Sequence, residues 1–117
     1  MLNLPIDFSS NECCSVIKNV LMHEKIVDYL HPTLKERSTL YLIKNEFCNF
    51  NDYVNNLKII TIEEKNLRRS ANFIKITSIK KTNGGQIISL SYPIEGAFFK
   101  VHLDNYQKII RVEVLEI

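Results

Sequence analysis

The chain lacks the features that mark the best-known functional classes. Its 15 basic side chains barely exceed its 13 acidic ones, for a formal net charge of +2. So small an excess does not provide the positive field that non-specific nucleic-acid binding needs. No apolar stretch is long enough to cross a membrane, and the N-terminus has neither the basic residue nor the apolar segment of a signal peptide. We therefore expect a cytoplasmic protein that binds neither nucleic acid nor membrane.

Cysteine is scarce, and its arrangement does not suggest a disulfide framework. There are three cysteines, an odd number, and Cys13 and Cys14 are adjacent, so they could bridge each other only with strain. Cys13 falls on the apolar stripe of a predicted helix, while Cys48 lies beside Phe47 and near Phe50. The sequence therefore predicts reduced, buried thiols.

Recognisable constellations for metal binding or catalysis are also missing. The chain has three histidines, His23, His31 and His102. They are far apart in the sequence and lack the spacing of usual metal ligands. Glu63 and Glu64 are neighbours on a predicted strand, so their carboxylates point to opposite faces. Gly84-Gly85 is not followed by a helix, as a phosphate-binding loop would require. We expect no metal, no cofactor and, on balance, no catalytic activity.

What is present is enough apolar material for one domain spanning residues 1–117, since 45% of the residues are hydrophobic. Ser9 and Glu12 form a capping box, and apolar residues then recur at three- and four-residue steps. A helix should begin near Ser10 and end by Leu30, because Pro32 restricts the residue before it to extended geometry. A break near residues 23–25, which would divide it into two helices, remains open.

The middle of the chain is ambiguous. Thr33 and Glu36 could form a second capping box, whereas the aromatic and β-branched segment 39–43 is equally typical of a strand. We expect a turn of helix followed by a strand. Asn51 is a candidate helix cap, with a short helix continuing to Leu57. The predicted helical part therefore covers residues 9–57.

From residue 58 the hydrophobic period changes to two, which indicates five strands with one buried face. The alternating sets are Ile60 and Ile62; Ile74 and Ile76; Ile88, Leu90 and Tyr92; Phe99, Val101 and Leu103; and Ile110, Val112 and Val114. Turn residues at 82–85 and 104–107 predict an antiparallel meander, and Pro93 predicts a wide loop after a strand end. The expected fold is α+β, with an amphipathic N-terminal helix packed on a curved antiparallel sheet of about four to six strands over residues 58–117.

The order of these elements, and above all the closing hairpin Phe98–Val114, resembles the nuclear-transport-factor-like superfamily, whose fold is a cystatin-like cone. That superfamily contains isomerases, cyclases, dehydratases, transport adaptors and bacterial immunity proteins, and the fold does not choose among them. Its isomerases place a tyrosine on the first helix and acids inside the cone. Here the first helix has no tyrosine before Tyr29, which weakens the resemblance to the enzymes.

A binding surface is predicted around the second-last strand. Phe98 and Phe99 are neighbours and must point to opposite faces. If Phe99 is buried with Val101 and Leu103, Phe98 shares the other face with polar side chains, where an aromatic residue is a common anchor for a protein partner. A loop or a second subunit could equally cover that face. The predicted partner-binding residues are Tyr92, Glu95, Phe98, Lys100 and His102.

The functional prediction is a non-enzymatic protein-binding domain of the bacterial cytosol. The resemblance implies an immunity or antitoxin-type protein that binds and neutralises a toxin. One alternative is a small-ligand isomerase or cyclase with an apolar pocket between helix and sheet, using one of three tyrosine hydroxyls: Tyr29, Tyr41 or Tyr53. Another alternative is a homodimeric adaptor.

Overall fold

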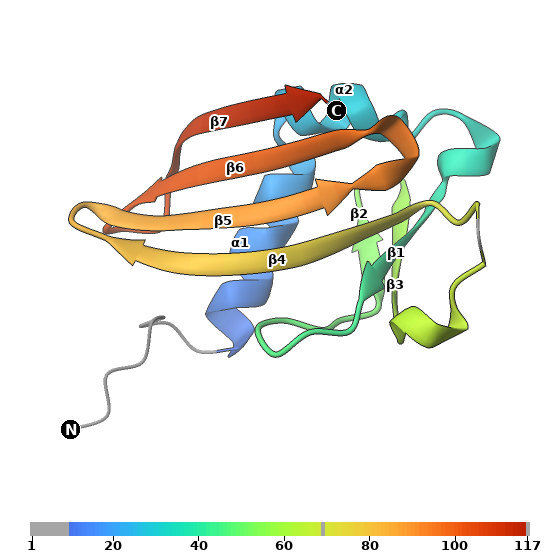
Figure 1. Cartoon of the computed structure of the whole chain (residues 1–117), viewed down its shortest axis with the longest axis horizontal. Helices are drawn as coiled ribbons and strands as arrows, with labels where there is room; N and C mark the ends of the chain where they lie inside the picture. Colours follow the sequence, from blue (N-terminus) through green and yellow to red (C-terminus); the bar gives the residue numbers. More distant parts are fainter. Residues whose placement is uncertain (1–9, 69, 117) are drawn as a thin grey trace.

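The structure is a computed structural model that describes residues 10–68 and 70–116. Within these ranges the chain forms two helices and a seven-stranded mixed sheet (Figure 1). The elements are α1 (Ser10–Met22), α2 (Glu24–Leu30), β1 (Thr39–Ile43), β2 (Asp52–Val54), β3 (Leu57–Ile62), β4 (Phe73–Thr82), β5 (Gly85–Tyr92), β6 (Ala97–Asp104) and β7 (Ile109–Glu116). The α+β class is confirmed, but the sheet has more strands than the predicted four to six and is not wholly antiparallel.

The helical region begins at Ser10 and is interrupted at His23, as the sequence allowed. Ser9 of the predicted capping box lies outside the described residues. His23 has an extended backbone, and its Nδ1 accepts a hydrogen bond from the backbone N–H of Lys25 at 3.2 Å, so it caps α2. α2 ends at Leu30 as expected, but His31 is left-handed, with φ 49°, rather than extended. Among the described helices, none has the length and apolar character needed to cross a membrane.

The segment after α2 corrects two predictions. The predicted helix from Asn51 to Leu57 is wrong, because β2 and β3 form a hairpin in which Val54 pairs with Leu57. Asn55 makes the turn possible with a positive φ of 55°, a conformation that asparagine tolerates better than most residues. The predicted cap at Thr33 is also wrong, since the short 3₁₀ turn here begins at Lys35 without a side-chain cap. The strand at residues 39–43 is confirmed.

The sheet order is β2-β3-β1-β4-β5-β6-β7. Strands β4 to β7 form the predicted antiparallel meander. β1, however, lies between β3 and β4 and runs parallel to both, so β3 does not join the meander directly. Figure 1 shows the four long strands side by side, with α1 crossing them at a steep angle.

One face of the meander forms the core with the helices. The apolar stripe of α1 and α2 is buried against it, as predicted, through Val16, Ile17, Val20, Leu21, Ile26 and Leu30. From the sheet, β5 contributes Ile88 and Leu90, and β6 contributes Phe99, Val101 and Leu103. The helices therefore cover one face of β4–β7 and leave the opposite face outward.

Two strands bury different residues from those that simple alternation predicts. In β3, Leu57 and Ile59 are buried while Ile60 and Ile62 are only half-buried. In β7, a register shift opposite His102 and Leu103 leaves Ile110 65% exposed. An extra residue in one strand of a pair interrupts the alternation of faces, so the expectation that Ile110 is buried is wrong.

The predicted tight turns are present. Thr82 pairs with Gly85 across a two-residue connection between β4 and β5. Between β6 and β7, Asp104 Oδ1 accepts from the backbone N–H groups of Tyr106 and Lys108 at 2.8 and 3.0 Å. The predicted wide loop at Pro93 is instead one compact 3₁₀ turn, Pro93–Glu95, that leads directly into β6.

Candidate functional site

The predicted binding residues fall into two groups in the structure. Phe98, Lys100 and His102 are half-buried on β6 and alternate with fully buried neighbours. Phe99 is buried, as the prediction required. These three side chains therefore lie together on the side of the meander that faces away from the helices.

Strand pairing adds neighbours to these residues, because residues directly opposite each other share a face. Phe98 lies between Ser91 and Leu115, and Leu115 is 52% exposed. We call this surface the outer face and define it by Lys75, Ser78, Lys80, Ile87, Ser89, Ser91, Phe98, Lys100, His102, Arg111, Glu113 and Leu115. The β7 residues were missed in the sequence, although their alternation with Val112 and Val114 was a usable signal.

The outer face carries an excess of positive charge. Glu113 Oε1 lies 2.7 Å from Arg111 Nη2 and 3.4 Å from His102 Nε2. Lys75 pairs with Glu64 at 3.1 Å. Lys80 and Lys100, in contrast, make no ion pair with another described residue, so both are available to an acidic surface.

Tyr92 and Glu95 belong elsewhere. Tyr92 is completely buried, and its hydroxyl donates a hydrogen bond to Asn72 Oδ1. Arg37 Nη1 approaches the same hydroxyl at 3.4 Å and its Nη2 donates to Glu95 Oε2 at 2.7 Å. Burial raises the pKa of Tyr92 above its ordinary value. This buried cluster fixes the Pro93–Glu95 turn against the connection that precedes β1 and does not form part of the outer face.

The buried cluster predicts a clear stability effect for Tyr92→Phe. The substitution removes the hydroxyl and leaves Asn72 Oδ1 buried without its partner, so we expect a loss of about 1–3 kcal/mol in the free energy of unfolding. Urea denaturation followed by circular dichroism measures it. Tyr106→Phe is the matched control, because Tyr106 is 83% exposed and should change stability by less than about 0.5 kcal/mol. Equal effects of the two substitutions would contradict the assignment.

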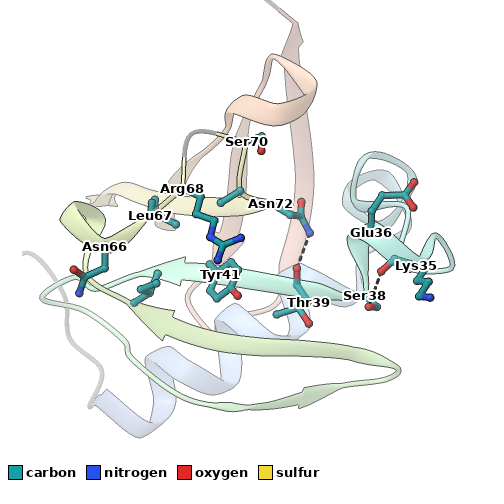
Figure 2. Close-up of a pocket in the computed structure, with 12 residues that line it drawn as sticks. Lys35, Glu36, Ser38, Thr39, Tyr41, Asn66, Leu67, Arg68, Ser70 and Asn72 are labelled. Carbon is teal, nitrogen blue, oxygen red and sulfur yellow. Dashed lines mark hydrogen bonds between the residues drawn. The ribbon is translucent and has the colours of Figure 1, made fainter.

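A polar cavity of about 630 Å³ lies beside β1 (Figure 2). Its wall includes Tyr41, Arg68 and Asn72, and Figure 2 shows the Arg68 side chain directed toward Tyr41. The cavity lies on the side of β1 opposite the buried Leu40 and Leu42. It is therefore separate from the interior between helix and sheet, where the isomerase hypothesis requires a pocket.

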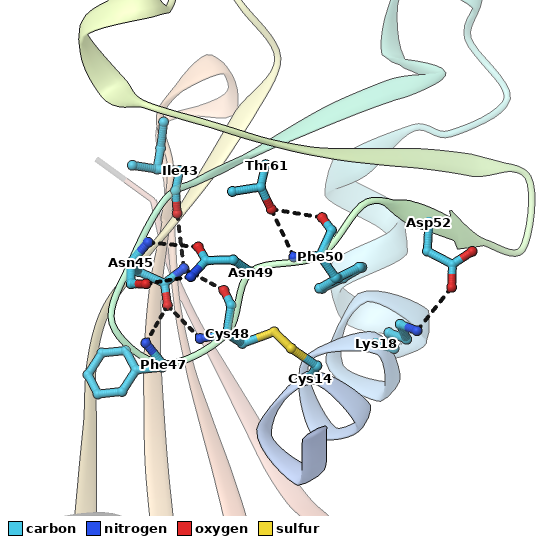
Figure 3. The surroundings of a disulfide bond; sticks show 10 residues. All are labelled: Cys14, Lys18, Ile43, Asn45, Phe47, Cys48, Asn49, Phe50, Asp52 and Thr61. Atoms are coloured by element: carbon cyan, nitrogen blue, oxygen red, sulfur yellow. Dashed lines mark hydrogen bonds and ion pairs between the residues drawn. A yellow bond between two sulfur atoms is a disulfide. The ribbon is translucent and has the colours of Figure 1, made fainter. Parts of the chain in front are cut away.

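The cysteines correct the expectation of reduced thiols. Cys14 on α1 and Cys48 form a disulfide (Figure 3). Asn45 organises the loop that presents Cys48: its Oδ1 accepts from the backbone N–H groups of Phe47 and Cys48, both at 2.8 Å. A pairing between residues 34 positions apart depends on how the loop meets the helix, so spacing alone gave no signal.

Cys13 is the remaining free cysteine, and it is buried. Burial raises the pKa of its thiol to about 11, so the thiol is protonated at neutral pH and is a poor nucleophile. Elsewhere in the described ranges, no group of three histidine, cysteine, aspartate or glutamate side chains is arranged to hold a metal ion.

No family model, curated protein or solved structure matches this chain. The resemblance to the nuclear-transport-factor-like superfamily thus stays a prediction based on element order.

Proposed function

We propose that this chain is a non-enzymatic protein-binding domain that contacts an acidic protein partner through the outer face. The observation that supports it is the pairing of Phe98 with Leu115 on the uncovered side of the meander, next to Lys100 on the same strand, with Lys80 further along the same face. Both helices pack on the other side of the sheet (Figure 1), so this face is open to a partner.

The chemistry of the outer face suits protein recognition. An aromatic side chain beside an aliphatic one provides an apolar centre that a partner can desolvate, and a few such residues supply most of the energy of an interface. The surrounding lysines favour partners of opposite charge and accelerate their association. Arg111 and Glu113 already neutralise each other at 2.7 Å and contribute mainly to the polar rim.

The more specific proposal is an immunity or antitoxin-type role, in which the outer face covers an acidic surface of a toxin. It rests on the resemblance to the cone superfamily and on the binding character of the face. The alternative small-ligand isomerase or cyclase has less support. Apolar side chains such as Ile17, Leu90 and Phe99 fill the interior between α1 and the meander. A cavity of about 430 Å³ does lie between the helices and the β2–β3 hairpin, but its described lining includes neither a tyrosine nor a carboxylate.

Comparative capture tests the binding role. Tagged wild type, Phe98→Ala and Tyr53→Ala are incubated with lysate of the native cell, and captured proteins are quantified by mass spectrometry. Tyr53 is the matched control because it is an exposed aromatic residue on β2, at the other end of the sheet. We expect a stoichiometric partner with wild type and Tyr53→Ala but not with Phe98→Ala. Identical capture by all three folded proteins would reject the outer face.

Affinity measurements with the captured partner give the expected magnitude. Truncating a central aromatic anchor should weaken binding by about 2 kcal/mol, or roughly 30-fold in Kd. Lys100→Glu should weaken it further at low salt, because it reverses a charge facing an acidic partner. Lys108→Glu, in the exposed turn before β7, makes the same charge change outside the face. If the two reversals weaken binding equally, the effect comes from net charge alone.

A further inference from the structure

The two edge strands of the sheet are β7 on one side and β2 on the other. β2 has only three residues, whereas β7 has eight. A long edge strand presents a row of backbone N–H and C=O groups that can pair with another strand. β7 is therefore the edge with more capacity for strand addition.

The hydrogen-bond pattern shows which residues of β7 turn their backbone outward. The N–H of Asp104 donates to the carbonyl of Lys108 at 2.9 Å, so Asp104 and alternate residues of β6 direct their backbone groups toward β7. Arg111 lies opposite His102, which is one of these residues, so the backbone groups of Arg111 point toward β6. The backbone groups of the next residue, Val112, therefore point away from β6, toward the free edge. In agreement, the Val112 carbonyl accepts from Lys25 Nζ of α2 at 3.4 Å. Val112 and Val114 thus present their N–H and C=O groups at the free edge.

We infer that two copies of this chain associate through β7, antiparallel, with Val112 opposite its counterpart in the second copy. In this register Arg111 lies opposite Glu113 of the second copy, and the twofold symmetry forms this contact twice. A symmetric register centred on Arg111 would instead place like charges opposite each other, and so would one centred on Glu113. Opposite charges across strands stabilise pairing and like charges oppose it, so among these three registers the charges favour the one centred on Val112, in which the Arg111–Glu113 pair within each copy is joined by the same pair between copies.

Apolar residues flank this central contact. In the same register Ile110, which is 65% exposed, lies opposite Val114 of the second copy. The twofold axis is perpendicular to the sheet, so the two outer faces become one continuous surface. The association uses the backbone edge of β7 and does not depend on the proposed partner of the outer face.

Lys25 opposes the pairing. Its Nζ contacts the Val112 carbonyl at the free edge, and lysines at this position commonly protect edges from strand addition. The lysine is exposed and has to move aside before a second strand can bind. We therefore expect weak, concentration-dependent dimerisation that becomes tighter in Lys25→Ala.

Sedimentation velocity of the full chain, from about 1 to 300 µM, tests the inference with three variants. Wild type should shift from monomer to dimer across this range, and Lys25→Ala should shift at lower concentration. Glu113→Arg places two arginines opposite each other and should weaken dimerisation at least tenfold. The swap Arg111→Glu with Glu113→Arg restores opposite charges and should return the dimer to within about threefold of wild type.

The outcomes distinguish this contact from other associations. Monomers at every concentration for both wild type and Lys25→Ala would overturn the inference. A dimer that Glu113→Arg leaves unchanged would also overturn it, because the contact would then lie elsewhere. Circular dichroism and thermal unfolding confirm that each variant is folded, and capture of a partner through Phe98 is measured separately.

Discussion

Gly85→Ala is expected to destabilise the protein by about 3 kcal/mol or more, whereas Gly84→Ala should change stability by less than about 0.5 kcal/mol. A Cβ on Gly85 would lie 1.8 Å from the backbone oxygen of Leu103 and 2.8 Å from the carbonyl carbon of Asp104. The backbone of Gly85 also has φ +155°, a conformation that L side chains rarely adopt. β5 and β6 would have to separate to admit the methyl group.

The neighbouring glycine is a natural control. A Cβ on Gly84 would meet no atom within 4 Å, although it lies in the same turn and the substitution is chemically identical. Urea denaturation of both variants measures the difference. Comparable stabilities for the two would contradict the close approach of β5 and β6 at Gly85. If Gly85→Ala cannot be purified in folded form while Gly84→Ala can, the expected order is still observed.

Reduction of the Cys14–Cys48 disulfide is expected to lower the free energy of unfolding by about 3–4 kcal/mol. The bond closes a loop between residues 34 positions apart, and the loss of chain entropy in the unfolded state on cross-linking such a loop accounts for that magnitude. It also connects α1 to the segment that leads into β2, so its loss should loosen that contact first. Thermal unfolding with and without reductant measures the effect.

Cysteine variants provide the controls for the disulfide. Cys14→Ser and Cys48→Ser should resemble the reduced protein and no longer respond to reductant. Cys13→Ala should retain the wild-type response, because Cys13 is free and buried. Three reactive thiols in the denatured, unreduced protein would contradict the bond. Disulfides are rare in cytosolic proteins, so counting thiols in protein isolated from its cell also tests the predicted cytoplasmic location.

Local patterns in the sequence predicted most of the helices and strands. The apolar stripe identified the helical region, and alternation identified all five strands after residue 57. The prediction of secondary structure failed where the same residue is typical of both a helix start and a turn. Asn51 could begin a helix, but Asn55 adopts a positive φ that closes the β2–β3 hairpin. Whether this segment forms a helix or a hairpin depends on whether β2 and β3 can pair in the folded chain.

Part of the candidate site was predicted correctly, because strand alternation is also a local pattern. Adjacent residues of a strand point to opposite faces, so the burial of Phe99 placed Phe98 on the outer face. Alternation with Ile88 and Leu90 already placed Tyr92 on the buried face, so its choice as a partner-binding residue was wrong. The hydrogen bonds of its hydroxyl could not be predicted, because Asn72 and Arg37 come from distant segments. The neighbours of Phe98 on β7 likewise required the register between two strands.

The sequence by itself determined the α+β class, the helical region between residues 10 and 30, the β4–β7 meander and the division of β6 into buried and outward residues. These features depend on the backbone preferences of individual residues and on the spacing of apolar residues within short segments of the chain. Only the tertiary structure decided the insertion of β1 beside β4, the Cys14–Cys48 bond and the free edge at β7. Those features depend on which distant segments come together, and that is a property of the packed chain as a whole.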